Sequence, residues 1–261
     1  MIVLENVSKT FDGGARYSVQ GVSLHVPRGK MLVLLGGSGC GKTTTLKMIN
    51  RLIDPTSGRI TVNGRDVRRT DPVELRRGIG YVFQGSGLFP HMTVAENIAI
   101  VPKLLRWPKK GIRARVDDLL QMVNLPAEQY RDRLPRQLSG GQQQRVGFAR
   151  ALAAGPEVML LDEPFGALDP VTRDELRAEF LSLRRRLGLT TVMVTHDMIE
   201  ALLSADLIAV MNAGRLCQLG TPQELMAHPA DEFVAALMAS PKHQTRCLQV
   251  LAEVTLPGGA A

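Results

Sequence analysis

The sequence contains the eight residues Gly36-Gly37-Ser38-Gly39-Cys40-Gly41-Lys42-Thr43, which match the pattern G-x-x-x-x-G-K-[ST] at every defined position. An apolar run, Met31–Leu35, precedes them, and a helix-like run that begins at Thr44 follows. A strand, a glycine-rich turn and a helix in this order aim backbone N–H groups at one point, where the helix N-terminus adds partial positive charge. The lysine can reach terminal phosphates, and the threonine hydroxyl can ligate Mg²⁺. The stretch predicts a phosphate loop that, together with Thr44, binds a nucleoside triphosphate.

Length and composition bound the class of protein. The chain has 261 residues, of which 44% are hydrophobic, enough for one large domain or a core with an inserted lobe. No run approaches the roughly 18 apolar residues of a membrane span, and the N-terminus lacks the pattern of a signal peptide. Three scattered cysteines show no metal-ligand spacing. We therefore expect a cytosolic globular protein that holds no metal through cysteine.

The net charge of +7 leaves nucleic acid and anionic membrane surfaces open as partners. Aromatic residues make up only 4% of the chain, and no basic run is interleaved with them as single-strand binders require. We interpret Arg184–Arg186 as the solvated face of a helix. Charge alone therefore decides no function.

Periodicity divides the chain into an α/β core and a helical insertion. Residues 1–84 carry short strand signals, whereas residues 85–150 carry amphipathic helical patterns punctuated by prolines. Residues 151–240 alternate strands and helices, which predicts a parallel sheet. We expect one domain over residues 1–240, with a mostly parallel sheet, an N-terminal antiparallel β subdomain and an inserted α-helical subdomain at 85–150. Residues 241–261 are expected to form a short tail.

A second motif follows the apolar strand Val158–Leu161, where Asp162 and Glu163 come directly after it. The carboxyl end of a parallel strand lies at the sheet edge where ligands bind, so both carboxylates are expected beside the phosphate loop. Asp162 can hold the Mg²⁺ coordination shell, and Glu163 can act as a general base toward attacking water. An acidic helix start before Pro164 is the simpler alternative.

A third motif, Leu138–Gln142, reads Leu-Ser-Gly-Gly-Gln. Ser139 and Gln142 have the spacing of a capping box, which a helix start alone would explain. Gly140 and Gly141 are harder to explain in that way, because each glycine weakens a helix by about 0.5–1 kcal/mol relative to alanine. Bare backbone at a helix N-terminus suits an incoming phosphate. Since the chain already has one phosphate loop, this second site is expected to serve the nucleotide of another subunit.

The motifs together resemble those of ABC-transporter ATPase subunits in order and spacing, over roughly residues 1–240. The motifs that carry the resemblance are the phosphate loop, Gln84, the signature at 138–142, Leu160–Pro164, Ala167–Asp169 and Thr195–Asp197. The resemblance implies a P-loop NTPase core and a homodimer that holds two ATP molecules, each between one phosphate loop and the opposing signature.

The resemblance also implies roles for single residues. Phe11 resembles the aromatic that stacks on adenine, with Tyr17 as the second candidate and a core position of Phe11 as the alternative. Gln84 would touch Mg²⁺ and attacking water, so that the Mg²⁺ shell involves Thr43, Gln84 and Asp162. His196 resembles a switch histidine that contacts the γ-phosphate and orients Glu163, although a lone histidine is more often structural. Further residues implied are those of the partner-facing signature and the dimer seam: Ser139, Gly140, Gly141, Gln142 and Asp169.

The resemblance extends to what the ATPase powers. Segments 48–58 and 87–102 are similar to ATPases that import glycine betaine, choline and related osmoprotectants. This implies a subunit at the cytoplasmic face of the inner membrane, with separate permease subunits and a periplasmic or lipid-anchored solute-binding protein. An importer of another solute, such as a polyamine, amino acid or inorganic anion, remains open. A soluble nucleic-acid-linked ATPase is the remaining alternative, although no nucleic-acid partner is expected.

Overall fold

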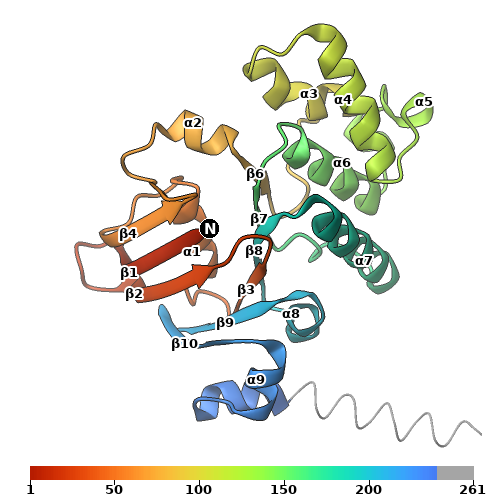
Figure 1. Cartoon of the computed structure of the whole chain (residues 1–261). Helices are drawn as coiled ribbons and strands as arrows, with labels where there is room; N and C mark the ends of the chain where they lie inside the picture. Colours follow the sequence, from red (N-terminus) through yellow and green to blue (C-terminus); the bar gives the residue numbers. More distant parts are fainter. Residues whose placement is uncertain (240–261) are drawn as a thin grey trace, which may run out of the picture.

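The computed structural model describes residues 1–239, so the expected tail at 241–261 lies outside the described residues. Two sheets and a group of helices make up the structure (Figure 1). The central sheet has six strands, in spatial order β10 (Arg215–Gly220), β9 (Leu207–Asn212), β3 (Met31–Leu35), β8 (Thr190–Thr195), β7 (Val158–Asp162) and β6 (Ile79–Val82). All neighbours pair in parallel except β10, which forms an antiparallel hairpin with β9.

The second sheet is antiparallel and is formed near the N-terminus. Its strands, in spatial order, are β2 (Tyr17–Val26), β1 (Ile2–Thr10), β4 (Ser57–Val62) and β5 (Arg65–Asp66). A mostly parallel sheet with an N-terminal antiparallel sheet is the α/β fold that the sequence predicts, and this prediction is confirmed.

The helices occupy two regions. Those associated with the sheets are α1 (Lys42–Ile49), α2 (Pro72–Arg77), α7 (Pro170–Leu187), α8 (Met198–Ser204) and α9 (Pro222–Ala227). Between β6 and β7 the chain forms α3 (Val94–Leu104), α4 (Lys109–Met122), α5 (Ala127–Tyr130), the 3₁₀ turn η1 (Pro135–Gln137) and α6 (Gly140–Leu152). Helices α3, α4 and α5 gather at one end of the molecule, and α6 lies between them and α7 (Figure 1).

Strand β3 shows how the sheet joins two hydrophobic clusters. Met31, Val33 and Leu35 pack into a cluster with the helices, whereas Leu32 and Leu34 pack into a cluster with α1 and the antiparallel sheet. All five side chains are at most 1% exposed. A strand buried on both faces has to be apolar throughout, and this is why the run before the phosphate loop is continuous rather than alternating.

The interpretation of Arg184–Arg186 as a solvated face is wrong for Arg184. Its guanidinium is buried and donates to the carbonyl oxygen of Gly29 at 3.1 Å and to Asp206 Oδ2 at 3.0 Å. Arg185 and Arg186 are exposed as expected. Position 184 shares the inward face of α7 with Phe180 and Leu181, and its charge is buried because a carboxylate and a carbonyl satisfy it.

Candidate functional site: a phosphate loop beside paired carboxylates

The predicted phosphate loop joins β3 to α1. Gly41 is the N-cap of α1 with φ of 102°, and a Cβ atom on it would lie 2.2 Å from the carbonyl oxygen of Ser18. At Gly36 a Cβ atom would lie 2.1 Å from the carbonyl oxygen of Met211. Both positions therefore exclude every side chain, and the backbone itself lines the loop.

A cavity of about 650 Å³ opens at this loop. Its lining joins residues from distant parts of the sequence, namely Ser18, Ser38, Gly39, Gly41, Lys42, Thr43, Thr44, Gln84, Glu163 and His196. The carboxyl ends of β3, β6, β7 and β8 meet here, because neighbouring parallel strands end at one edge of the sheet. Apart from Ser18, each lining residue is one that the sequence singles out.

Lys42 is buried and turned toward its own loop. Its ammonium donates to the carbonyl oxygens of Gly36 and Gly37, both at 2.8 Å, and lies 3.7 Å from Cys40 Sγ. A buried ammonium is stable only with such partners. These contacts hold the Lys42 ammonium inside the loop, where phosphate oxygens can replace the carbonyl oxygens as its acceptors.

Asp162 stands at the end of β7 and receives a hydrogen bond on each carboxylate oxygen. Thr43 Oγ1 donates to Oδ1 at 3.0 Å, and the Tyr81 hydroxyl donates to Oδ2 at 3.4 Å. Burial first, and then the negative charge of Asp162, raise the pKa of Tyr81 well above its ordinary value, so Tyr81 stays a donor. Sequence reasoning missed Tyr81. The sequence offered one indication of its role, because Tyr81 carries a hydroxyl and lies in β6, which pairs in parallel with β7, the strand that ends in Asp162.

Glu163 leaves the sheet with φ of 45°, an uncommon conformation for a residue other than glycine. Gln84 Nε2 donates to Glu163 Oε2 at 3.3 Å, and His196 Nδ1 lies 3.3 Å from the same oxygen. A non-glycine residue in this region of φ often marks a functional position. The three side chains thus meet at the cavity as the resemblance implies.

The signature residues lie at the start of α6, on the helical side of the molecule (Figure 1). Ser139 is the N-cap, Gln142 completes a capping box, and Gln142 Nε2 donates to the Tyr130 hydroxyl at 3.2 Å. The simpler interpretation as a helix start is therefore correct as far as it goes. Gly140 is exposed, so the backbone at this N-terminus is accessible.

The candidates for adenine stacking, Phe11 and Tyr17, and the candidate for the dimer seam, Asp169, do not line the cavity. Phe11 is 64% exposed with the Lys9 ammonium 4.9 Å from its ring centroid, so a core position of Phe11 is wrong. Tyr17 is 43% exposed and precedes Ser18, which lines the cavity. Asp169 is the exposed N-cap of α7, where hydrogen bonds from Thr172 lower the pKa of its carboxyl.

Comparison with known proteins places these residues in a family. The ABC transporter family model matches residues 19–166, more than half of the chain. The chain belongs to the ABC transporter family. The match covers the phosphate loop, the signature and both carboxylates.

Relatives within the ABC transporter family include proteins of osmoprotectant transport. The chain is 55% identical over 234 residues to "Choline transport ATP-binding protein OpuBA" of Bacillus subtilis, a match over 90% of this chain and 61% of that protein. It is 51% identical over 255 residues to "Osmoprotectant import ATP-binding protein OsmV" of Salmonella typhimurium, over 97% of this chain and 67% of that protein. The chain therefore spans about three fifths of the length of OpuBA and about two thirds of that of OsmV.

A solved ABC transporter cassette has the same fold. The ATP-binding cassette MJ0796, solved as a dimer in a post-hydrolysis state with ADP and Pi, is 34% identical with a TM-score of 0.75. The match covers 85% of this chain and 99% of that one. No helix within residues 1–239 is both long and apolar enough to span a membrane.

In this ABC transporter chain, the loop after Gln84 connects the cavity to the helices. The backbone N–H of Ser86 donates to Gln144 Oε1 at 3.2 Å, and Arg150 donates to the carbonyl oxygens of Gly87 and Ser86 at 2.8 and 3.0 Å. Both partners are buried on α6. Sequence reasoning named Gln84 but missed Gln144 and Arg150, whose polar side chains lie on the inward face of an amphipathic helix.

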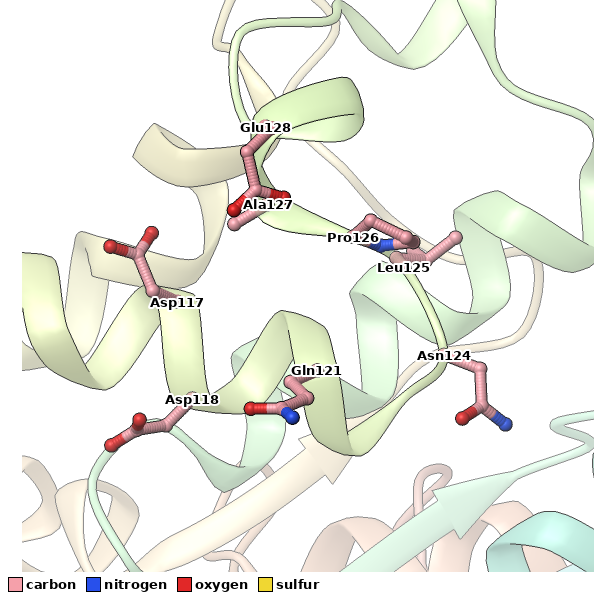
Figure 2. Close-up of a pocket in the computed structure, with 8 residues that line it drawn as sticks. All are labelled: Asp117, Asp118, Gln121, Asn124, Leu125, Pro126, Ala127 and Glu128. Carbon is pink, nitrogen blue, oxygen red and sulfur yellow. The ribbon is translucent and has the colours of Figure 1, made fainter.

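A second hollow, of about 610 Å³, lies between α4 and α5 and is partly acidic. The carboxylates of Asp117 and Asp118 point away from each other (Figure 2). Within residues 1–239 no group of three histidine, cysteine or acidic residues is arranged to hold a metal ion. We assign no ligand to this hollow.

Proposed function

We propose that this chain is the ATP-hydrolysing subunit of a bacterial importer for osmoprotectants such as glycine betaine or choline. The observation that carries the ATPase is the meeting of Lys42, Glu163 and His196 at one cavity. Asp162 accepts a hydrogen bond from Thr43, which also lines that cavity. The cargo rests on the identity of 55% with OpuBA and 51% with OsmV.

The phosphate loop binds the triphosphate. No side chain fits at Gly36 or Gly41, so the loop is lined there by backbone that can approach phosphate oxygens. Lys42 contributes its ammonium to the β- and γ-phosphates. Phe11 or Tyr17 stacks on the adenine ring, and the exposure of both aromatic side chains supports this role.

Thr43 and Asp162 fit a Mg²⁺ ion, because a hydroxyl and a carboxylate oxygen only 3.0 Å apart provide the hard oxygen ligands that this ion prefers. Gln84 lies beside Glu163 and can complete the shell. When bound with the nucleotide, Mg²⁺ neutralises charge on the β- and γ-phosphates. Oxygens of the nucleotide and water supply the remaining ligands of the ion.

Glu163 orients the attacking water and accepts its proton as general base. Gln84 and His196 both contact Oε2, which fixes the direction of the carboxylate. Such a positioned base contributes typically about 10²–10⁴-fold to the rate. His196 is well placed to contact the γ-phosphate, since its side chain is 63% exposed at the cavity.

A second copy of the chain completes each site. The start of α6 presents the exposed backbone of Gly140, flanked by the side chains of Ser139 and Gln142, to a γ-phosphate held by the phosphate loop of the partner copy. Asp169 lies at the seam between the copies. The dimeric state of the MJ0796 cassette supports this arrangement.

The membrane-spanning partners are separate permease subunits, with a solute-binding protein outside the membrane. A largely apolar groove of about 480 Å³ between α3 and α4 suits a permease segment. Its rim carries Lys103, Lys109 and Arg113, and it is lined in addition by Ala99, Trp107, Ile112 and Val116. The chain then works at the cytoplasmic face of the membrane.

The test is Glu163→Gln in the purified chain and in cells that also carry its permease subunits. We expect MgATP affinity within about threefold of wild type, turnover lowered by about 10²-fold or more, and no uptake of labelled choline or glycine betaine. Hydrolysis at the wild-type rate would overturn the base assignment. Transport of neither compound by active wild-type protein would overturn the cargo.

A further inference from the structure

The first turn of α7 lies where three functional segments meet. It follows the loop with Leu168 and Asp169, it packs beside the signature at the start of α6, and it faces the loop that carries His196. One side chain in this turn, Arg173, contacts two of these segments directly.

Arg173 uses separate nitrogens for separate partners. Nη2 donates to the carbonyl oxygen of Leu168 at 3.0 Å, and Nη1 forms an ion pair with Asp197 Oδ2 at 3.5 Å. The side chain is 29% exposed and that of Asp197 is 36% exposed, so the ion pair by itself contributes little to stability. A guanidinium can span two acceptors because its donors are fixed in a rigid plane, whereas a lysine ammonium is a single point charge.

Asp197 in turn fixes the backbone on both sides of His196. Its carboxylate Oδ1 caps α8 by accepting from the N–H of Glu200 at 3.0 Å, and its own N–H donates to Thr195 Oγ1 at 3.0 Å. His196 lies between these two anchored residues, with Nδ1 3.3 Å from Glu163 Oε2. A shift of Asp197 therefore moves the imidazole relative to the general base.

The signature abuts the same turn from the other side. A Cβ atom on Gly141 would lie 2.6 Å from Thr172 Cγ2, and one on Gly140 would lie 3.6 Å from Leu168 Cδ2. Thr172 directly precedes Arg173 in the chain, and the carbonyl oxygen of Leu168 accepts a hydrogen bond from Arg173. Displacement of α6 or of the loop at 168–169 is therefore transmitted to the guanidinium.

We infer that Arg173 is a positioning residue that couples the loop at 168–169 to His196 through Asp197. This rests on the proposed ATPase function and adds a route to it. When the loop at 168–169 of one copy packs against the other copy, His196 of the first copy is oriented toward Glu163. Arg173 itself touches neither the nucleotide nor the attacking water.

The experiment compares Arg173→Ala with Arg186→Ala, which removes one exposed charge from the same helix. We expect Arg173→Ala to lower kcat by about tenfold, because small misplacement of a catalytic group costs up to about 10²-fold. The KM for MgATP stays within about twofold of wild type, and Arg186→Ala keeps the wild-type kcat. Arg173→Lys is expected to fail as Arg173→Ala does, since it cannot hold both partners.

A second readout separates positioning from a general loss of structure. In a His196→Ala background, Arg173→Ala is expected to produce no further loss of kcat, because the residue through which it acts is gone. Asp197→Asn keeps an N-cap amide oxygen but removes the charge, and it should lower kcat without adding to the effect of Arg173→Ala.

The outcomes distinguish this inference from the function on which it rests. Equal fractional losses from Arg173→Ala with and without His196 would overturn the coupling, as would wild-type turnover by Arg173→Ala. A wild-type chain without Glu163-dependent ATP hydrolysis would instead overturn the proposed function.

Discussion

At the scale of single residues, the site depends on hydrogen bonds that hold charged groups in one direction. Asp162 illustrates this, because Thr43 and Tyr81 each bond a different oxygen of its carboxylate. A carboxylate held by two donors presents its remaining lone pairs at defined angles. Such an orientation matters for Mg²⁺, which demands near-octahedral geometry.

Tyr81→Phe removes one of these donors and keeps the ring that packs on Phe83, with centroids 4.5 Å apart. A lost hydrogen bond to a charged group costs about 1.5–3 kcal/mol when buried, and less at the 3.4 Å observed here. We expect MgATP to bind about threefold more weakly, with no change for ATP in the presence of EDTA. Titration calorimetry under both conditions measures this. An equal loss under both conditions would assign Tyr81 to packing instead.

Glu200 gives a prediction of pH dependence. Its side chain is 4% exposed, and burial raises the pKa of its carboxyl above the ordinary value of 4.5, although a hydrogen bond from Thr195 opposes the shift. The folded state therefore keeps a proton that the unfolded state has released, and the free energy of unfolding falls as pH rises from about 4.5 through the raised pKa. Glu200→Gln does not titrate.

The stability of Glu200→Gln relative to wild type should therefore increase as pH rises above 4.5 and then level off. Urea unfolding over a pH series measures the difference. Glu175→Gln, at an exposed position on α7, serves as the control for loss of a surface carboxylate. A difference that does not change with pH would contradict the prediction.

At the scale of elements, the loop before α3 is stabilised by one buried amide. Asn97 is fully buried, accepts from the N–H of Phe89 at 2.8 Å, and donates to the carbonyl oxygens of Phe89, Met92 and Thr93. This side chain replaces the backbone partners that a short irregular loop lacks. The loop therefore keeps its shape without regular secondary structure.

Asn97→Ala leaves several partly buried backbone groups without their side-chain partner, each at a cost of up to about 1–3 kcal/mol. We expect the free energy of unfolding to fall by about 3 kcal/mol and amide exchange to speed up in residues 86–93. Gln121→Ala, on the exposed side of α4, should stay within about 0.5 kcal/mol of wild type. Unchanged exchange in 86–93 would show that the loop is held by other contacts.

The sequence predicts a helix or strand well where a clear hydrophobic pattern or a helix-capping motif marks it. Strand β3 covers the whole apolar run Met31–Leu35 that precedes the phosphate loop, and Ser139 caps α6 with Gln142 as the capping-box spacing predicts. Helix α2 was not foreseen, although Asp71 and Pro72 form its N-terminus, because its six residues bury only Leu75 and carry no period. The burial of Arg184 depends on Asp206, a partner 22 residues away that local pattern does not specify.

The same contrast holds within the candidate site. Lys42, Asp162 and Glu163 could be named from the sequence because each ends or follows a recognisable strand. Tyr81 and Arg173 could not, because their roles arise only when β6 pairs with β7 and α7 packs beside the His196 loop. Motifs identify groups that meet the ligand, whereas the groups that orient them are fixed by tertiary contacts.

At the scale of the whole molecule, the phosphate loop and the signature lie on different parts of one chain. Under the proposed function, two copies of the chain together form each nucleotide site. Lys42→Ala disables the loop, and Gly140→Asp places a negative charge at the exposed start of α6. An acidic residue in the first turn favours the helix, and a Cβ atom at this position has only an ordinary contact with Leu168. The second variant should therefore fold normally.

Each variant alone is expected to be inactive, with turnover lowered by about 10²-fold or more, as for loss of an oxyanion or phosphate contact. Mixing the two should restore part of the activity, because a mixed dimer contains one site with an intact loop and an intact signature. Steady-state ATPase rates at varied ratios measure this. Absence of recovery at every ratio, with both proteins folded and dimeric, would contradict the composite site.

The loop that joins Gln84 to α6 has a thermodynamic consequence for the assembly. Ser86 and Gly87 are bonded to Gln144 and Arg150, while Gln84 touches Glu163, so one short stretch of chain belongs to two regions at once. If a protein seated on α3 and α4 strengthens nucleotide binding by some factor through this stretch, linkage requires that the nucleotide strengthen the grip on that protein by the same factor. Nucleotide binding and binding of that protein would then strengthen each other equally.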